Sequence, residues 1–387
     1  MNLLLVSIDS LRWDYVSRTH PSLVTPAFDR LTDHFLFTDR FFAVSSATRP
    51  VHSSLLTGLY PFEHGVLGMH YPAMRPGIPH LFDLCEKAGY QVRAYSQVPS
   101  IFTGLAFFRW LVPYQTEQVY QAVDSSDASP TCLFLHYWDT HTPYGAADGK
   151  ALGETLALLK TGHTHLVQQR YIQAIETLFE DELAPLLARL DMSKWCVIIL
   201  SDHGESWTQD EPYHGQTLNN SVLRVPLYLH LPGSGNPPLL RPINSQIDIL
   251  PTLINRLHLP LAYHGFGVDL FNKTHENAHP YYLAQIDPIA TNDDFATALS
   301  NTSQQTDQKW ALFNAKTKFS YDQTTQQGKL EDTISEHPIH GALPTDHFVK
   351  TYEALIRTSR YNAFSLASDD NTHLLLEQRL KELGYLA

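Results

Sequence analysis

The stretch from Ser45 to Gly65 places a hydroxyl group where it could act as a nucleophile. Pro50 suits the first position of a helix, because its missing N–H costs nothing there, and Gly58 can adopt the left-handed conformation that ends a helix. Thr48 would then lie just before a helix N-terminus, where backbone N–H groups and the helix dipole attract anions. A hydroxyl at this position could attack a tetrahedral oxyanion ester. The alternative is an ordinary threonine before an ordinary helix.

Two apolar runs that end in aspartate predict where the partners of this hydroxyl lie. Leu3–Asp9 and Cys196–Asp202 are typical of buried central strands in an α/β sheet. Ligands of open α/β sheets bind beyond the carboxyl ends of the strands, so the two aspartates should meet at one sheet edge. Two carboxylates, an imidazole and a hydroxyl suit a divalent metal. The predicted metal ligands are Asp9, Thr48, Asp202 and His203.

The order of motifs resembles the sulfatase-like branch of the alkaline phosphatase/sulfatase superfamily. The nucleophile motif of that family is Cys, Ser or Thr, then x-Pro-x-Arg and a Ser-Leu-Leu-Thr-Gly run, and Thr48–Gly58 is similar to it. Further matches follow in family order over nearly the whole chain. They are Asp9 with Leu11-Arg12, Lys87–Tyr90, Asp139–Tyr144, Ser201–Glu205, Leu223–Leu227, Asp248–Leu253 and Leu383–Leu386. The resemblance implies an alkaline phosphatase-like fold and metal-dependent ester hydrolysis.

Three positions depart from the formylglycine sulfatases of this superfamily. Thr48 stands where those enzymes carry Cys or Ser, and it cannot be oxidised to their aldehyde hydrate. Ser10 stands in place of a second metal-binding Asp, and His52 in place of an Arg. One carboxylate fewer and the imidazole of His203 favour Zn²⁺ or Mn²⁺ over Mg²⁺ or Ca²⁺. The remaining set resembles the single-metal site of Thr-nucleophile phosphotransferases, which favours phosphorus chemistry.

The expected reaction has two steps. Thr48 attacks phosphorus in line and forms a phosphothreonine, which water then cleaves. His141 and His214 are the candidates for leaving-group acid and oxyanion clamp, because histidines titrate near neutral pH. One metal is expected, and a second metal on Asp139, His141 and His214, as in two-metal relatives, is the alternative. The predicted substrate contacts are His52, Arg49 and Asp139.

The predicted function is a metal-dependent hydrolase of phosphoesters: a phosphodiester, a phosphonate monoester or a phosphomonoester. The alternatives among enzymes are a sulfatase with an unmodified hydroxyl nucleophile and a phospho-group transferase. The known transferase relatives are membrane-anchored and this chain shows no anchor, so hydrolysis is favoured. A catalytically inactive sulfatase-like binding protein is a further alternative, which the presence of all four expected ligands disfavours. The sequence does not indicate the leaving group.

Composition predicts which partners and which compartment the protein has. The chain of 387 residues carries a formal net charge of −13, which disfavours nucleic acid and anionic membranes and leaves a small anionic ester as the expected partner. No apolar run approaches the ~20 residues of a membrane span, and no signal-peptide pattern occurs. Cys85, Cys132 and Cys196 lack a Cys-x-x-Cys spacing, so we expect buried thiols and a cytoplasmic location. The oligomeric state is not indicated.

The alternation of strands and helices predicts an α/β fold with one large, mostly parallel sheet covered by helices on both faces. We expect this catalytic domain over residues 1–278 and a smaller α+β subdomain over residues 279–387 packed on it. A long helix is expected over Leu166–Leu190, kinked or broken at Pro185. The aromatic-rich stretch Ser96–Gln121 is expected to form a surface helix packed on the core, and an aromatic wall of the substrate site is the alternative.

The C-terminal part predicts one small hairpin and one helix. Trp310–Phe313 and Lys318–Tyr321 alternate like two antiparallel strands. The polar, Gln- and Thr-rich residues of Asn301–Glu336 are expected to run over the surface around this hairpin, away from the chemistry. His373–Gly384 is expected to form an amphipathic helix at the end.

Overall fold

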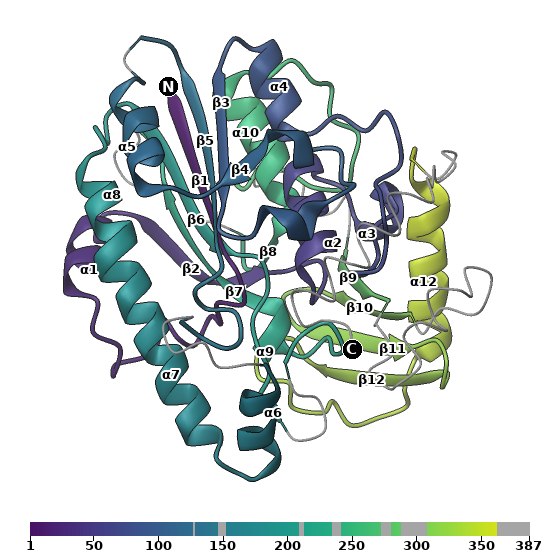
Figure 1. Cartoon of the computed structure of the whole chain (residues 1–387). Coiled ribbons are helices and arrows are strands. Elements are labelled where there is room, and N and C mark those ends of the chain that lie inside the picture. The colour runs from purple at the N-terminus through teal and green to yellow at the C-terminus, as the bar shows by residue number, and fades with distance from the viewer. Residues whose placement is uncertain are drawn as a thin grey trace.

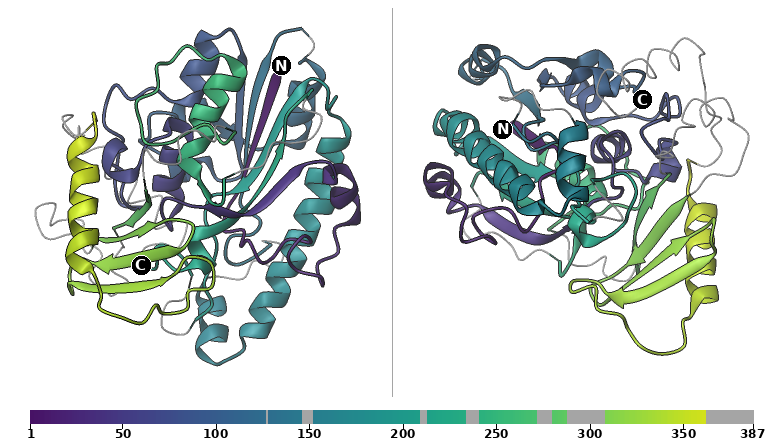
Figure 2. Two further views of the ribbon diagram at one scale, coloured as in Figure 1. Left: turned by 180° about the vertical axis from the view of Figure 1, so that it is seen from behind. Right: turned by 60° about the horizontal axis from the view of Figure 1, so that its bottom comes forward.

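The computed structural model describes residues 1–126, 128–145, 152–208, 213–233, 241–271, 280–287 and 308–361 and contains two β-sheets (Figure 1). The large sheet has eight strands in the order β4-β3-β5-β1-β6-β7-β2-β8, and the small sheet has four in the order β12-β11-β10-β9. Helices lie on both sides of the large sheet (Figure 2). The predicted α/β architecture is confirmed.

The large sheet is parallel apart from one strand. Its strands are β1 (Asn2–Ile8), β2 (Leu36–Phe42), β3 (Gln91–Ser96), β4 (Leu111–Pro113), β5 (Thr131–Tyr137), β6 (Trp195–Ser201), β7 (Arg224–His230) and β8 (Asn244–Ser245). Strand β7 pairs antiparallel with β6 and β2, and the other pairings are parallel. Strand β1 lies between β5 and β6 and is buried along its whole length. A strand covered on both faces needs apolar residues at successive positions, which explains the run of Leu and Val in β1.

Alternate residues of β1 face two different helix layers. Leu3 and Leu5 belong to one core, with residues of α2, α4 and α10, whereas Leu4 and Val6 belong to a second core, with residues of α1, α5, α7 and α8. The helices are α1 (Pro26–Thr32), α2 (Thr48–Thr57), α3 (Pro61–His64), α4 (Leu81–Lys87), α5 (Thr116–Asp124), α6 (Leu152–Lys160), α7 (Thr164–Thr177), α8 (Ala184–Ala188), α9 (Asn220–Leu223), α10 (Ile249–Leu257) and α12 (Thr345–Thr358). This sandwich fixes the strand ends that carry the candidate site.

The small antiparallel sheet lies between the large domain and α12. Its strands are β9 (Tyr282–Ile286), β10 (Lys309–Phe313), β11 (Thr317–Asp322) and β12 (Gln327–Asp332). Ala311 and Phe313 of β10 belong to the core of the large sheet, whereas Trp310 and Leu312 lie in a third core with α12. Trp310 stacks on Tyr352 of α12, with ring centroids 4.4 Å apart. The predicted hairpin is confirmed, and it forms the middle of a larger sheet.

The prediction of a single helix over Ser96–Gln121 is wrong. The chain forms two 3₁₀ turns, Pro99–Phe102 and Phe108–Trp110, then β4, and α5 begins only at Thr116. Proline and glycine interrupt this stretch before α5, and β4 gains a place at the sheet edge beside β3. The aromatic residues pack onto the core from these turns rather than from a helix.

The long helix is interrupted just before Pro185, as predicted. A π-helical turn, Leu178–Leu183, separates α7 from α8. Pro185 cannot donate a hydrogen bond to the preceding turn, so the helix widens there. The π-helical turn also contacts the start of α1. A carboxylate oxygen of Glu180 accepts the N–H groups of Ala27 and Phe28 at 3.0 and 3.1 Å.

The expectation that Asn301–Glu336 runs over the surface is wrong for its described part, because Trp310, Leu312 and Phe319 are buried. That the segment lies away from the chemistry stays a prediction. The average polarity of the segment conceals apolar residues at alternate strand positions. Helix α12 was not predicted, and the helix expected over His373–Gly384 lies outside the described residues. The domain boundary at 278/279 also falls on undescribed residues and stays a prediction. Within the described ranges, no helix is both long and apolar enough to cross a bilayer.

Candidate active site

Strands β1 and β6 end side by side and bring two aspartates to the same edge. The last residues of the two strands are paired in a parallel register, so Asp9 and Asp202 follow at the same level. Asp202 Oδ1 accepts the N–H of Ser10 at 3.0 Å and that of His203 at 2.7 Å. Ser10 has a left-handed backbone with φ of 60°, and this turn aims its N–H at Asp202. The Ser10 hydroxyl donates to Asp9 Oδ1 at 2.8 Å.

Thr48 begins α2 and holds its hydroxyl against both strand ends. Thr48 Oγ1 donates to Asp9 Oδ2 at 3.2 Å and lies 3.3 Å from His203 Nε2. The residue before the helix provides no side-chain cap, which leaves the first N–H groups for an anion. The helix ends at Gly58 with φ of 69°, as predicted, but begins two residues before Pro50, so Thr48 lies inside its first turn.

The chemistry of the donor set fits a divalent metal. Ligand atoms of Asp9, Asp202 and His203 lie within 4.8 Å of one another, and all three residues are fully buried. Asp202 Oδ2 has no hydrogen-bond partner and lies 3.4 Å from His203 Nε2. His203 Nδ1 donates to the Gly204 carbonyl at 2.9 Å, so Nε2 presents its lone pair. The structure thus brings the predicted ligands together, and their binding of a metal stays a prediction.

The two carboxyl groups have opposite pKa shifts. Burial raises the pKa of Asp202 well above its usual value, and the charge of Asp9 raises it further. Burial also acts to raise the pKa of Asp9, but the hydrogen bond with His136 and the neighbouring histidines hold it well below its usual range. Two carboxylates this close cannot both stay ionised without a nearby positive charge. A divalent cation would supply that charge.

His214 is held beside this group by a buried carboxylate. Its Nδ1 lies 3.2 Å from Glu205 Oε1 and 3.4 Å from Ser10 Oγ, and its ring centroid lies 4.4 Å from that of His203. Burial alone would lower the pKa of His214, but the charge and hydrogen bond of Glu205 raise it above its usual value. His214 is therefore suited to carry a positive charge near the nucleophile.

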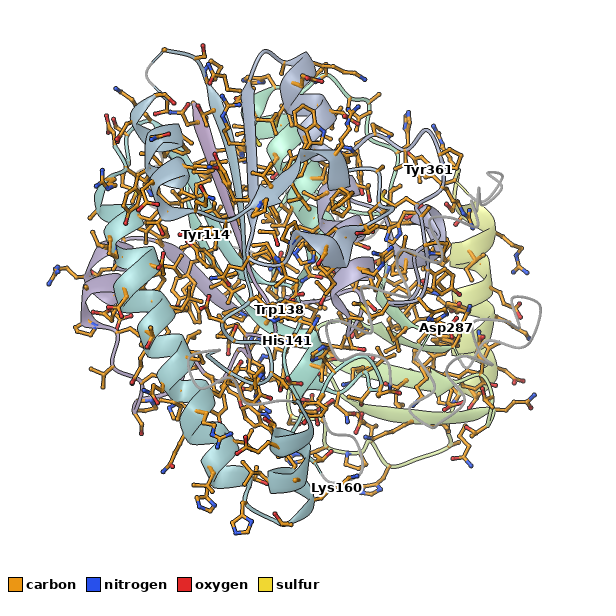
Figure 3. The ribbon with its side chains drawn as sticks, in the orientation of Figure 1. Tyr114, Trp138, His141, Lys160, Asp287 and Tyr361 are labelled. Carbon is orange, nitrogen blue, oxygen red and sulfur yellow. The ribbon has the colours of Figure 1, made fainter. Side chains whose placement is uncertain are left out.

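His141 and Asp139 lie in the turn after β5. His141 Nδ1 donates to the Thr142 carbonyl at 2.7 Å, and its ring stacks on Trp138 with centroids 3.7 Å apart (Figure 3). Burial lowers the pKa of His141 to about 3, so the ring is neutral with its lone pair on Nε2. Asp139 Oδ2 is buried without a hydrogen-bond partner. Over the described residues, Asp139, His141 and His214 do not form a group with metal-ligand spacing, so a second metal there gains no support.

Arg49 is fully buried and hydrogen-bonds to the backbone of two neighbouring loops. Its two terminal nitrogens donate to four backbone carbonyls at 2.6 to 3.1 Å, those of Ile101, Thr103, Tyr71 and Pro72. Burial lowers the pKa of Arg49 to about 9. These contacts occupy both terminal nitrogens and leave only the buried Nε without a partner, so they support a role in holding the loops. The expected substrate contact stays a prediction. His52, one turn after Thr48, is also fully buried, with Nδ1 donating to the Thr48 carbonyl at 2.8 Å.

Sequence reasoning missed His136 and the role of Glu205. His136 lies within β5, and its Nε2 is 3.3 Å from Asp9 Oδ2 while Nδ1 is 2.8 Å from Ser96 Oγ. The signal available in the sequence was a histidine inside an otherwise apolar strand, which burial makes costly unless it has a partner. Glu205 stands in a quoted motif, but its contact with His214 depends on a loop that the motif does not specify.

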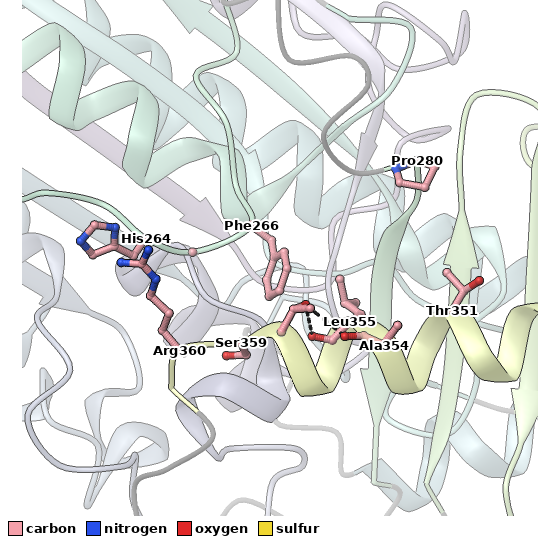
Figure 4. A pocket seen from close by; sticks show the side chains of 10 residues that line it. His264, Phe266, Pro280, Thr351, Ala354, Leu355, Ser359 and Arg360 are labelled. Carbon is pink, nitrogen blue, oxygen red and sulfur yellow. Dashed lines mark hydrogen bonds between the residues drawn. The ribbon is translucent and has the colours of Figure 1, made fainter.

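A cavity of about 440 Å³ lies elsewhere, between α12 and the stretch His264–Phe266 (Figure 4). Its lining includes Phe266, Leu355 and Arg360 and none of the candidate residues above. The cavity therefore plays no part in the site described here.

Comparison with known proteins concerns the fold and the N-terminal part of the chain. A family model for type I phosphodiesterases and nucleotide pyrophosphatases matches residues 3–80, the stretch that contains Asp9 and Thr48. A putative sulfatase from Bacteroides thetaiotaomicron is 13% identical with a TM-score of 0.68, and the match covers 96% of each chain. No curated protein is similar enough in sequence to count as a relative.

Two phosphonate monoester hydrolases have the same fold. The enzyme from Silicibacter pomeroyi is 14% identical with a TM-score of 0.66, and 92% of this chain and 94% of that chain are covered. The enzyme from Agrobacterium radiobacter is 17% identical with a TM-score of 0.64, and 98% of this chain and 96% of that chain are covered. With the family model over Asp9 and Thr48, these findings confirm the resemblance to the sulfatase-like branch of the alkaline phosphatase superfamily.

Proposed function

We propose that the chain is a metal-dependent hydrolase of phosphate or phosphonate esters that works through a covalent phosphothreonine at Thr48. The observation that carries the proposal is the position of Thr48 Oγ1, 3.2 Å from Asp9 Oδ2 and 3.3 Å from His203 Nε2 in the first turn of α2. Asp9 and His203 can accept the proton of this hydroxyl, and the N–H groups at the start of α2 can bind the negatively charged oxygens of the ester. The fold shared with ester hydrolases supports the same class.

The proposed metal is Zn²⁺ or Mn²⁺, because an imidazole completes the carboxylate set. Held by Asp9, Asp202 and His203, it would lower the pKa of the Thr48 hydroxyl and offset negative charge on the phosphoryl oxygens. A small anionic ester as substrate, no nucleic-acid partner and a cytoplasmic location belong to the same proposal and rest on the sequence.

Thr48 carries both half-reactions. Its hydroxyl donates to Asp9 Oδ2, which can accept the proton. As the proton passes to Asp9, Oγ1 bonds to phosphorus while the bond from phosphorus to the leaving-group oxygen breaks. In the second half-reaction a water oxygen bonds to phosphorus, the bond to Oγ1 breaks, and the proton held by Asp9 returns to Oγ1.

His214 suits both proton transfers, and His141 suits the orientation of water. Glu205 favours the protonated form of His214, which can donate its proton to the leaving oxygen. The neutral imidazole that remains can take a proton from the attacking water. Burial makes His141 a weak base, but its lone pair on Nε2 can accept a hydrogen bond from that water. The ring centroids of the two histidines lie 4.9 Å apart, so both can face one phosphorus.

Phosphorus is proposed over sulfur because of the nucleophile. A phosphothreonine can be hydrolysed by attack of water at phosphorus, whereas a sulfothreonine lacks the route by which an aldehyde hydrate expels sulfate. A phosphoryl group also brings more negative charge, which a cation and a protonated His214 stabilise. Turnover of a sulfate ester should therefore stall after the first step.

The test compares kcat/KM for matched nitrophenyl esters: a phosphodiester, a phosphomonoester, a phosphonate monoester and a sulfate, each with Zn²⁺ and Mn²⁺. We expect a phosphorus ester to be preferred and Thr48→Ala to lower its turnover by at least about a thousandfold. Ser53→Ala is the matched control, because its hydroxyl donates to the Arg49 carbonyl within the same helix. A sulfate rate above every phosphorus ester would make the protein a sulfatase. Near-normal turnover in Thr48→Ala would exclude the threonine nucleophile.

A further inference from the structure

His52, His136 and Asp202 form a second group with metal-ligand spacing behind Thr48. One ligand atom of each lies within 4.8 Å of the others, and all three side chains are fully buried. They come from three elements, because His52 lies in α2, His136 in β5, and Asp202 follows β6. The group shares only Asp202 with the set of Asp9, Asp202 and His203.

Both histidines are held as metal ligands usually are. His52 Nδ1 donates to the Thr48 carbonyl at 2.8 Å, and since a carbonyl can only accept, Nε2 carries the lone pair. Without a cation, His136 Nε2 carries the proton that it donates to Asp9 Oδ2 at 3.3 Å. His136 Nδ1 lies 2.8 Å from Ser96 Oγ, a hydroxyl that can accept a proton from Nδ1, so binding of a cation can move the proton to Nδ1 and free the lone pair of Nε2. Fixing one ring nitrogen on a carbonyl or hydroxyl while the other binds the ion is the usual arrangement of metal-binding histidines.

Two buried atoms of this group lack a partner. His52 Nε2 and Asp202 Oδ2 each have no hydrogen-bond partner. Asp202 Oδ2 lies 3.9 Å from His52 Nδ1, the ring nitrogen that donates to the Thr48 carbonyl, and 3.4 Å from His203 Nε2 of the first group. The atom particular to the second group is therefore His52 Nε2, and a buried lone pair that lacks a donor destabilises the folded state. A cation bound at Nε2 would satisfy it.

We propose that His52, His136 and Asp202 bind a second divalent cation of the Zn²⁺ class. Two imidazole nitrogens and a carboxylate are a ligand set typical of Zn²⁺, and Asp9 Oδ2, 3.3 Å from His136 Nε2, is near enough to be a fourth. Asp202 would then be a ligand shared by the two groups. His52 and Thr48 share α2, so the second cation would tie the start of the nucleophile helix to β5 and β6.

This position differs from the second metal considered from the sequence, which used Asp139, His141 and His214. It also does not depend on which ester is hydrolysed, because its ligands are set by the buried faces of α2, β5 and β6. Its consequence for the site is positional: it holds the first turn of α2, and with it the Thr48 hydroxyl, against the strand ends.

The test is metal content. Chelator-treated protein is titrated with Zn²⁺, passed through gel filtration and analysed for metal, and Co²⁺ loading is followed by visible absorption. The wild-type protein should bind about two equivalents, and His52→Asn and His136→Asn about one each. Asparagine can keep the Nδ1 contact with the Thr48 carbonyl or Ser96 but cannot reach the position of Nε2. His64→Asn is the matched control, because His64 is buried outside both groups and bonded to Ser54, and it should retain the wild-type content.

Saturation of the wild-type protein at one equivalent would overturn the proposal, as would two equivalents in both His52→Asn and His136→Asn. Circular dichroism shows whether the variants fold, and if they do not, the wild-type titration decides by itself. The same titration in Thr48→Ala separates this proposal from the proposed function. Two equivalents in an inactive Thr48→Ala variant support both the second site and the threonine nucleophile. One equivalent in active wild-type protein would overturn the second site and leave the proposed function in place, whereas two equivalents in an active Thr48→Ala variant would do the reverse.

Discussion

Glu205 governs the charge of His214 from a fully buried position. Burial lowers the pKa of His214, and the carboxylate 3.2 Å from Nδ1 more than offsets this effect. A histidine whose pKa is raised is protonated below that pKa and loses its proton as the pH rises through it. If His214 is the leaving-group acid, turnover should fall on the alkaline side of the profile, and Glu205 should set where it falls.

We predict that Glu205→Gln moves the alkaline limb of the pH profile of kcat to lower pH by about one unit. His214→Gln should remove this limb and lower kcat about a hundredfold for an alkyl leaving group, with a smaller loss for nitrophenolate, which leaves without a proton. The measurement is kcat against pH for both esters. Glu182→Gln, whose carboxylate accepts the Tyr114 hydroxyl instead, should leave the limb in place. A limb unmoved by Glu205→Gln would show that another group is the acid.

The sequence could predict those site residues that lie at the end of a recognisable strand or at the start of a recognisable helix. Asp9 and Asp202 each follow an apolar strand, and Thr48 precedes a run that Pro50 and Gly58 mark as a helix, so their meeting at one edge follows from sheet geometry alone. His136 could not be found in this way. Its partner Asp9 lies 127 residues away, and a histidine inside a strand carries no signal of the neighbour it will meet.

At the scale of elements, Arg49 links α2 to the loops that flank it. Replacing it with methionine would leave four carbonyls without their donor, so Arg49→Met should lower the free energy of unfolding by about 3 kcal/mol or more. The KM of the folded protein should change less than about threefold, because the guanidinium does not need to meet the substrate.

Urea unfolding and initial-rate kinetics on the same preparation check this prediction. Arg93→Met is the control for loss of an arginine from an exposed position. Normal stability combined with a KM raised tenfold or more would restore Arg49 to the substrate contacts expected from the sequence.

The elements that were predicted wrongly from the sequence are those whose conformation depends on residues far away in the chain. Strand β4 forms because β3 offers it an edge, although its own residues sit in an aromatic stretch that could equally pack as a helix. Pro185 predicted an interruption, but the widening into a π turn goes together with Glu180 reaching the start of α1, which lies about 150 positions earlier in the chain. Helix α12 could not be predicted from its own residues alone, because its apolar face packs on the small sheet.

At the scale of the whole molecule, Glu63 joins the nucleophile side of the fold to the segment after α12. Its carboxylate accepts the N–H of Tyr60 at 2.9 Å and the hydroxyl of Ser359 at 2.8 Å. Burial raises the pKa of Glu63 to about 7. Because the folded pKa is raised, the stabilisation is complete below the unfolded pKa of about 4.5 and is lost as the pH rises through about 7, a change of about 3 kcal/mol.

Glu63→Gln should therefore raise the free energy of unfolding at pH 8 and change it little at pH 5, since the amide stays neutral at both. Urea unfolding at the two pH values measures the difference. Glu86→Gln, at an exposed position of α4, should show no such dependence. Equal effects of Glu63→Gln at pH 5 and pH 8 would contradict the prediction.

The two sheets should unfold together, because β10 contributes one face to each core. Trp310→Ala should lower the free energy of unfolding by about 3 to 5 kcal/mol, since the indole is buried and stacked on Tyr352. Far- and near-UV circular dichroism should still report one transition. Leu343→Ala, at an exposed position, is the control. Two separate transitions in Trp310→Ala would show that the small sheet is an independent unit.

The place of β1 between β5 and β6 also affects how the protein is made. Its last residue pairs with the end of β6 across 193 positions of the chain. A ribosome that adds about 5 to 20 residues per second finishes β6 roughly 10 to 40 s after β1. Until β5 is made, the apolar segment Leu3–Val6 has neither of its partners, and for the rest of that interval it lacks β6. A nascent chain in this condition is a substrate for chaperones and a nucleus for aggregation. Yield in a cell should therefore follow chaperone supply and growth temperature more closely than it follows the stability of the finished protein.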